Sequence, residues 1–191
     1  YLLNFILNSS EIDPVKEKVI SNIRFPRIIL SILVGASLAV SGASLQGIFK
    51  NPMADPGIIG VSSGAAVGAV LVISLGFASY SIFMLPMFSF IGGLSAAFLV
   101  FLISRFASNS SSTTFILSGL AVSAFLNSLI SLILVSSKKF GELTSILNWL
   151  AGGFQDSRWE HVYITFPVVL FSLPFLLIYS RTRLFAFLLV V

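Results

Sequence analysis

Charged residues divide this chain into long uncharged stretches, and these stretches constrain the fold more than any other feature of the sequence. Between Arg27 and Lys50 lie 22 uncharged residues, and between Asp55 and Arg105 lie 49. A helix of about 20 apolar residues crosses a hydrocarbon core of about 30 Å. Only 9% of the 191 residues are charged and 57% are hydrophobic, whereas about 25% of a soluble domain is charged. The composition therefore excludes a soluble enzyme, a nucleic-acid-binding domain and a disordered chain, and it indicates a membrane protein.

The uncharged stretches predict five membrane-spanning helices. The longest stretch is interrupted around Gly76–Pro86, so it is divided into two spans, and the polar string at 107–114 predicts a loop. The apolar runs are continuous rather than alternating, which favours helices over a barrel. We expect one all-α transmembrane bundle over 1–191, with spans at about 27–49, 57–78, 84–105, 115–135 and 159–180 and an interfacial helix at about 141–154 anchored by Trp149.

Small residues recur every four positions in the first two predicted spans. Small residues at this spacing allow helix backbones to approach closely in lipid. Tight helix packing is the favoured interpretation, and a face against a moving or subunit-contacting helix is the alternative. The residues are Gly35, Ala39, Ala43 and Gly47 in the first span, and Gly60, Gly64 and Gly68 in the second.

The sequence contains no recognisable catalytic constellation. It has no GxxxxGK[ST] phosphate loop, no HExxH motif and no cysteine, so we expect no ATP hydrolysis, no metal and no cofactor in this chain. The single His161 lies beside Trp159 and Glu160 and suits an interfacial position. No ionisable residue lies at the centre of a predicted span, which lowers the case for a proton-coupled carrier.

Two clusters flank the first predicted span. Arg24 and Arg27 are held around a proline, an arrangement that an ordinary interfacial anchor also has. The segment 46–57 contains prolines at 52 and 56, which predict a tight return between two spans. Either cluster alone is compatible with an ordinary helix end.

Together, these clusters resemble the FecCD-type permease subunits of bacterial ABC importers for iron–siderophore, heme and cobalamin. The resemblance covers about 20 to 180 and follows an ordered set of motifs. They are RFPR at 24–27, VGASLAVSGASLQG at 34–47, NPMADPG at 51–57, GVSSGAA at 60–66, STTFILSG at 112–119 and WLAGGF at 149–154.

The resemblance implies a permease of roughly ten spans in the bacterial cytoplasmic (inner) membrane. It implies a homodimer in lipid, two partner ATPase subunits that hold ATP and Mg²⁺, an external substrate-binding protein and no nucleic acid. The chain is then expected to be a fragment, with its first helix reduced to Tyr1–Asn8 and its second half missing.

The resemblance also assigns roles to individual residues. Arg24 and Arg27 match external arginines that dock acidic residues of the binding protein, and guanidinium groups grip carboxylates bidentately. Two loops match cytoplasmic gate loops with short side chains that narrow the pathway. The gate candidates are Asn51, Met53 and Asp55 in the first loop, and Thr113 and Thr114 in the second.

The residues alone leave alternatives for the orientation in the membrane and for the transported substrate. Seven basic residues lie on the predicted side of Arg24 and four on the side of Lys50. The positive-inside rule would place the seven in the cytoplasm, whereas the resemblance places them outside, and we expect the latter. A siderophore complex, heme and cobalamin are not distinguished. A secondary carrier or channel subunit not driven by ATP, and a purely structural membrane scaffold, remain alternatives.

Overall fold

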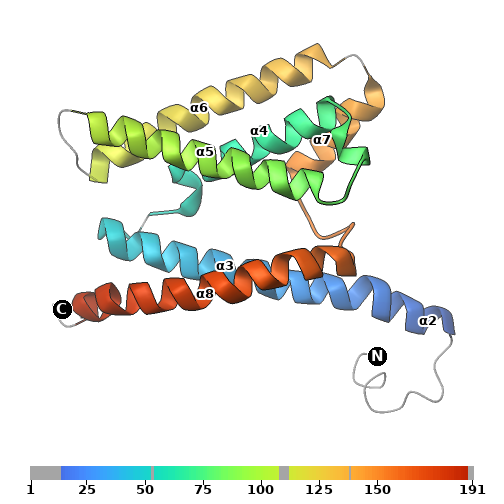
Figure 1. Ribbon diagram of the computed structural model, residues 1–191, viewed down its shortest axis with the longest axis horizontal. Helices are drawn as coiled ribbons and strands as arrows, with labels where there is room; N and C mark the ends of the chain where they lie inside the picture. The colour runs from blue at the N-terminus through green and yellow to red at the C-terminus, as the bar shows by residue number, and fades with distance from the viewer. Residues whose placement is uncertain (1–13, 53, 108–111, 138, 189–191) are drawn as a thin grey trace. The chain divides into compact units, whose positions relative to one another are not determined.

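The computed structural model describes residues 14–188, apart from 53, 108–111 and 138, and the regular structure within these residues is helical throughout (Figure 1). This confirms the all-α prediction. Three helical stretches are long and apolar enough to cross a membrane, and they are Val15–Phe49, Met84–Phe106 and Ser112–Ser136. The chain divides into two compact units, one made of Tyr1–Gly47 with Gly153–Val191 and the other of Ile48–Gly152.

The first unit begins with a helical stretch that changes its winding before a proline. Helix α2 (Pro14–Val19) leads into a π-helical turn, η2 (Ile20–Arg24), and then into α3 (Phe25–Phe49), which leaves the unit at Gly47. In η2 the Phe25 backbone N–H donates to the Ile20 carbonyl, five residues back. Pro26 has no N–H to donate, and it is buried at this junction. The wider turn therefore lies where the proline removes one donor from the helical ladder.

The same unit ends with α8 (Trp159–Leu188), which contains Pro167 and Pro174. Figure 1 shows α3 and α8 running in the same direction from the end of the unit where both begin. Internal prolines are tolerated in membrane helices because neighbouring groups satisfy the freed carbonyls. The predicted span 159–180 therefore lies within one longer helix.

The second unit begins with short helical pieces where the sequence predicted one span at 57–78. They are the 3₁₀ turn η3 (Pro56–Ile59), helix α4 (Val61–Ser74) and the 3₁₀ turn η4 (Phe77–Ser79). Gly60 and Gly76 separate the pieces, with φ angles of 83° and 75° in the left-handed region. A helix of 14 residues is about 21 Å long, shorter than the hydrocarbon core. The glycines thus break a segment that hydropathy alone presents as continuous.

Helices α5 (Met84–Phe106), α6 (Ser112–Ser136) and α7 (Phe140–Ala151) complete the second unit. Val70 of α4, Ile130 of α6 and Ile146 of α7 form its buried hydrophobic cluster. The sequence predicted α7 as an interfacial helix anchored by Trp149. In the structure this helix packs through Ile146, which is completely buried.

Glycines bring α4 and α5 into backbone contact. A Cβ placed on Gly64 would overlap the carbonyl oxygen of Gly92, and one placed on Gly68 would overlap the carbonyl oxygen of Phe88. Both positions belong to the predicted small-residue stripe, and both are buried. At the other stripe, in α3, a Cβ on Gly35 meets no described atom within 4 Å, and Ala39 and Ala43 are exposed.

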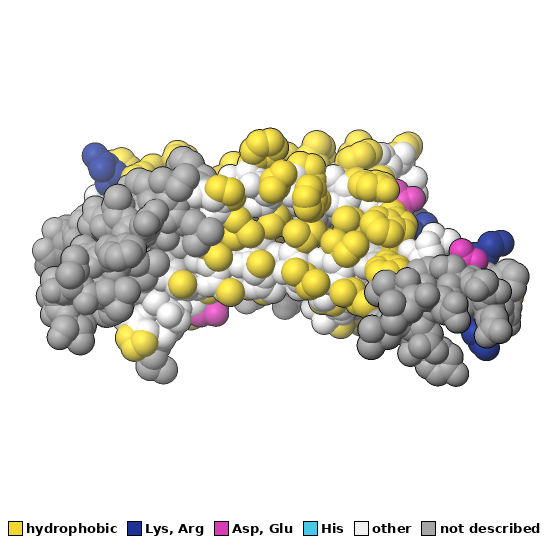
Figure 2. Space-filling model, turned by 90° about the horizontal axis from the view of Figure 1, so that it is seen from below, with side chains coloured by type: hydrophobic (Ala, Val, Ile, Leu, Met, Phe, Trp, Pro, Cys, Tyr) yellow, Lys and Arg dark blue, Asp and Glu magenta, His cyan; other side chains and the backbone are white. Residues whose placement is uncertain are grey.

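Large hydrophobic side chains cover the outside of the helices. Figure 2 shows them over the middle of the face in view, with charged side chains at its margins. On α5, Phe90, Leu94 and Phe98 follow one another at four-residue spacing, and each is at least 60% exposed. An apolar row of this size is a surface for lipid or for other membrane helices.

Replacing Gly68 by alanine is expected to force α4 and α5 apart. The added methyl has no room beside the Phe88 carbonyl, so the variant should lose about 1–3 kcal/mol of stability. Thermal unfolding in detergent would show this as a Tm lowered by several degrees. Gly42→Ala is the matched control, because a Cβ there meets nothing within 4 Å. An equal Tm for both variants would contradict the close contact.

Candidate functional site

The first candidate site lies where α3 begins, and Arg27 is at its centre. The Arg27 Nε donates to the Phe154 carbonyl oxygen and Nη2 donates to the Gln155 carbonyl oxygen, each at 2.9 Å. These carbonyls belong to the loop between α7 and α8. One exposed guanidinium therefore holds two successive peptide groups that are more than 120 positions away in the sequence.

A third hydrogen bond joins the same regions, with the donor now on the C-terminal side. The indole Nε1 of Trp159, the first residue of α8, donates to the Ser21 carbonyl oxygen at 3.0 Å. This carbonyl has no ordinary helical donor, because the Phe25 N–H bonds to Ile20 and Pro26 lacks an N–H. The indole thus satisfies a carbonyl that the π-turn and the proline leave open.

Arg24 differs from Arg27 in its surroundings. It is the last residue of η2 and is exposed. No hydrogen bond or ion pair joins its side chain to any residue of the described ranges. The structure therefore places both predicted docking arginines at one end of the unit, but only Arg27 is bonded to the loop.

His161 makes a side-chain hydrogen bond at the beginning of α8. Its Nδ1 accepts a hydrogen bond from the Arg158 backbone N–H at 3.1 Å. A side chain in the first turn of the helix thus accepts a hydrogen bond from the backbone N–H just before the helix, as the N3 side chain of a capping box does. Trp159 and Tyr163 stack one turn apart, with ring centroids 6.1 Å apart. His161 thus has a local structural role at the helix start.

The second candidate site is the loop that follows α3. The Asp55 Oδ1 accepts a hydrogen bond from the Gly57 backbone N–H at 2.7 Å, which caps η3. The Ala54 N–H donates to the Asn51 carbonyl at 3.1 Å. Lys50 precedes the loop with a φ of 48°, in the left-handed region. The Asp55 carboxylate therefore stabilises the turn in its own loop.

This loop packs against the beginning of α6. A Cβ on Gly119 would overlap the Ile58 carbonyl oxygen, and the Phe49 and Phe115 rings have centroids 5.5 Å apart. A cavity of about 10 Å³ remains between loop and helix, lined in part by Asp55 and Ile116. The two regions predicted as gate loops are therefore adjacent within one unit, but the prediction of a loop up to residue 114 was wrong, since Thr113 and Thr114 lie in the first turn of α6.

The individual gate candidates differ in exposure. Asn51 and Thr114 are half-buried, and Asp55 and Thr113 are exposed. The Thr114 carbonyl accepts a hydrogen bond from the Ser118 hydroxyl at 2.8 Å. Met53 lies outside the described residues. The structure brings Asp55 to the first turns of α6, close to Phe115 and Ile116.

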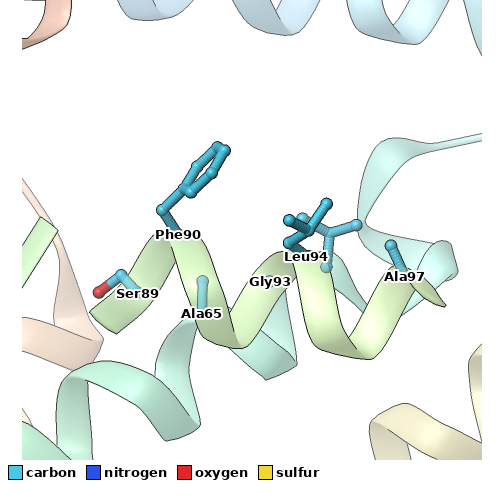
Figure 3. A pocket seen from close by; sticks show the side chains of 7 residues that line it. Ala65, Ser89, Phe90, Gly93, Leu94 and Ala97 are labelled. Atoms are coloured by element: carbon cyan, nitrogen blue, oxygen red, sulfur yellow. The ribbon is translucent and has the colours of Figure 1, made fainter. Parts of the chain in front are cut away.

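An apolar groove of about 350 Å³ opens between α4 and α5. Figure 3 shows Phe90, Leu94 and Ala97 projecting from one side of α5, with Gly93 on the same helix and Ala65 on α4. Its lining is apolar except for Ser89. Such a groove suits an acyl chain or an apolar helix face better than a polar substrate. Within the described ranges, no cluster of His, Asp and Glu residues could hold a metal ion.

The helical architecture and the candidate spans define a polytopic membrane protein, and comparisons identify its family. The FecCD transport family matches residues 2–184. The chain belongs to this family.

Individual relatives agree with the family match. The chain is 45% identical to the cobalamin import system permease protein BtuC of Halobacterium salinarum, over 85% of this chain and 43% of that protein. It is 42% identical to the molybdate import system permease protein MolB of Haemophilus influenzae, over 87% of this chain and 47% of that protein. It is 35% identical to the Fe(3+) dicitrate transport system permease protein FecC of Escherichia coli, over 86% of this chain and 49% of that protein.

The fold is also similar to a solved structure, a metal-chelate type ABC transporter in an inward-facing conformation. The TM-score is 0.79 at 39% sequence identity, covering 91% of this chain and 54% of that chain. The chain spans about half the length of the curated relatives it matches.

Sequence reasoning missed several structural contacts of the sites. The acceptors for Arg27 are backbone carbonyls, and a sequence motif gives no information about them because every residue has one. Trp159 was noted only as a neighbour of His161. Gly119 lies inside a motif that carried the resemblance, and its lack of a side chain was the available sign of a close contact.

Gly119→Ala is expected to displace the loop that follows α3 from α6. The added methyl would overlap the Ile58 carbonyl, so we expect a loss of about 1–3 kcal/mol and faster proteolysis at the loop. Limited proteolysis with mass spectrometry measures this. Gly141→Ala, where a Cβ meets nothing within 4 Å, should leave the cleavage rate unchanged. A Gly119 variant that is cut at the parent rate would refute the contact.

Proposed function

We propose that this chain forms part of a permease subunit of an ATP-driven ABC importer. The observation that carries the proposal is the match of residues 2–184 to the FecCD transport family. Relatives at 35–45% identity are named as permease proteins of import or transport systems. The long apolar helices fit the membrane part of such a machine.

ATP binding and hydrolysis then belong to partner chains. We propose two ATP-binding subunits that hold ATP and Mg²⁺, an external protein that delivers the substrate, and a second copy of the permease in the bacterial cytoplasmic membrane. The lack of a phosphate-binding loop in the sequence supports the first part. The permease itself is then non-catalytic, and it provides the pathway and the docking surfaces.

The proposed cargo is a metal-containing compound of the iron–siderophore, heme or cobalamin kind. The named relatives import cobalamin, molybdate and Fe(3+) dicitrate, and the similar solved structure is of metal-chelate type. These names span several chemistries, so they support the class of cargo better than one member of it.

The two candidate sites take opposite sides of the membrane in this proposal. The end of the chain that carries Arg24 and Arg27 faces outward and binds acidic residues of the delivering protein. The loop of Asn51, Met53 and Asp55, with Thr113 and Thr114 of the first turn of α6, narrows the cytoplasmic end of the pathway. The contact of this loop with α6 supports treating the two regions as one gate.

Uptake in whole cells tests the proposed function. A strain that depends on the intact protein should accumulate a radiolabelled compound from a panel of iron citrate, a ferric siderophore, hemin and cobalamin. Inactivation of the co-expressed ATPase should abolish the uptake, whereas an uncoupler that removes the proton gradient over a short assay should leave most of it. Uptake that follows the proton gradient and ignores the ATPase would establish the secondary carrier instead.

Charge reversal tests the docking role. The double variant Arg24→Glu and Arg27→Glu should weaken docking of the purified binding protein by about tenfold or more, because attraction to acidic residues becomes repulsion. Binding to the transporter in lipid nanodiscs measures this. Lys139→Glu, on the same predicted side, is the control and should stay near the parent affinity. Unchanged docking in the double variant would refute the assignment.

A further inference from the structure

The two arginines have different structural roles. We propose that Arg27 is a positioning residue that fixes the 152–158 loop within the docking surface, while Arg24 presents its guanidinium to the arriving partner. This inference rests on the proposed function, in which that end of the chain receives the binding protein. The partner class is a protein with exposed carboxylates.

The geometry of Arg27 supports a positioning role. Two of its five N–H donors are used on the adjacent carbonyls of Phe154 and Gln155. The flat fork of a guanidinium matches two acceptors held side by side, whereas a lysine ammonium is a single flexible point charge. Substitution by lysine therefore keeps the charge but loses the two-point grip. Arg24 has no such grip on any described residue.

Contacts from outside the loop add to one turn of its own, in which the Ser157 N–H donates to the Phe154 carbonyl at 3.3 Å. The loop begins with Gly152 and Gly153, whose φ angles are 71° and 130°, so its first residues occupy backbone regions open mainly to glycine. Arg27 holds the loop at 154–155. The Trp159 indole holds its far end to the Ser21 carbonyl. These contacts bracket the exposed residues between them.

Loop position matters for docking because the loop exposes both signs of charge. Asp156 and Arg158 are exposed. A partner that offers carboxylates to Arg24 is attracted by Arg158 and repelled by Asp156, so affinity depends on where the loop holds them. A loose loop removes this arrangement even when every positive charge is still present.

A matched pair of lysine variants separates charge from positioning. In the assembled transporter in nanodiscs, Arg24→Lys should keep docking of the binding protein within about twofold of the parent. Arg27→Lys should weaken it by about tenfold, since two charge-assisted hydrogen bonds to the loop are disturbed. Parent affinity in Arg27→Lys would overturn the proposal, as would equal losses in the two variants.

A spectroscopic measurement tests the loop without the partner. The chain has no cysteine, so Asp156→Cys provides one site in it for a spin label, with the partner subunits made cysteine-free. Arg27→Lys and Arg27→Ala should sharpen the label spectrum, and Arg24→Lys should leave it unchanged. Trp159→Phe, which keeps a ring but loses the N–H, should also mobilise the label. An unchanged spectrum in Arg27→Ala would overturn the proposal.

The two measurements distinguish this inference from the proposed function. The spin label could show a mobilised loop while docking stays at the parent affinity in both lysine variants and in the double charge reversal. This result would refute the docking role of this end of the chain. It would also overturn the place of the loop in a docking surface, although the Arg27–loop contact would stand. A mobilised loop with weakened docking only in the Arg27 variants supports both.

Discussion

The need to satisfy backbone carbonyl groups determines how the beginning of α3 is built. Pro26 removes one donor, and the π-turn gives the Phe25 N–H to Ile20, so the Ser21 carbonyl needs a donor from outside its own helix. The Trp159 indole supplies it. An unsatisfied polar group in a lipid setting costs several kcal/mol. A single proline is thereby linked to the position of a helix that begins more than 130 residues later.

The second unit depends on a different constraint, which is the lack of a side chain at three glycines that contact neighbouring elements. Gly64, Gly68 and Gly119 each face a backbone carbonyl of a neighbouring element. Because lipid gives helices little hydrophobic reason to associate, close approach and dispersion provide the attraction instead. The first two positions set the spacing of α4 and α5, and the third allows the loop that follows α3 to pack against α6. The unit is therefore assembled largely through backbone surfaces.

The sequence predicted the helical class and the family, because hydropathy and ordered motifs act over many residues. It presented 57–78 as one span, whereas Gly60 and Gly76 adopt left-handed conformations that divide the segment. It described α7 by Trp149, although the packing of this helix depends on Ile146. The Arg27 contact could not be predicted, since carbonyl acceptors exist at every residue and only the fold selects among them. The docking and gate roles stay predictions.

The contacts of Arg27 also bear on the order in which the chain assembles. Its acceptors lie 127 and 128 positions away, so the contact closes a very long loop, which contains the whole second unit. Loop-closure entropy grows slowly, by about 0.6 kcal/mol for each doubling of length, and a folded insert shortens the effective loop. The arginine can find its partners only after the intervening helices have been made. The contact between Arg27 and the loop is thus a late step, which joins two parts of one unit that are synthesised far apart in time.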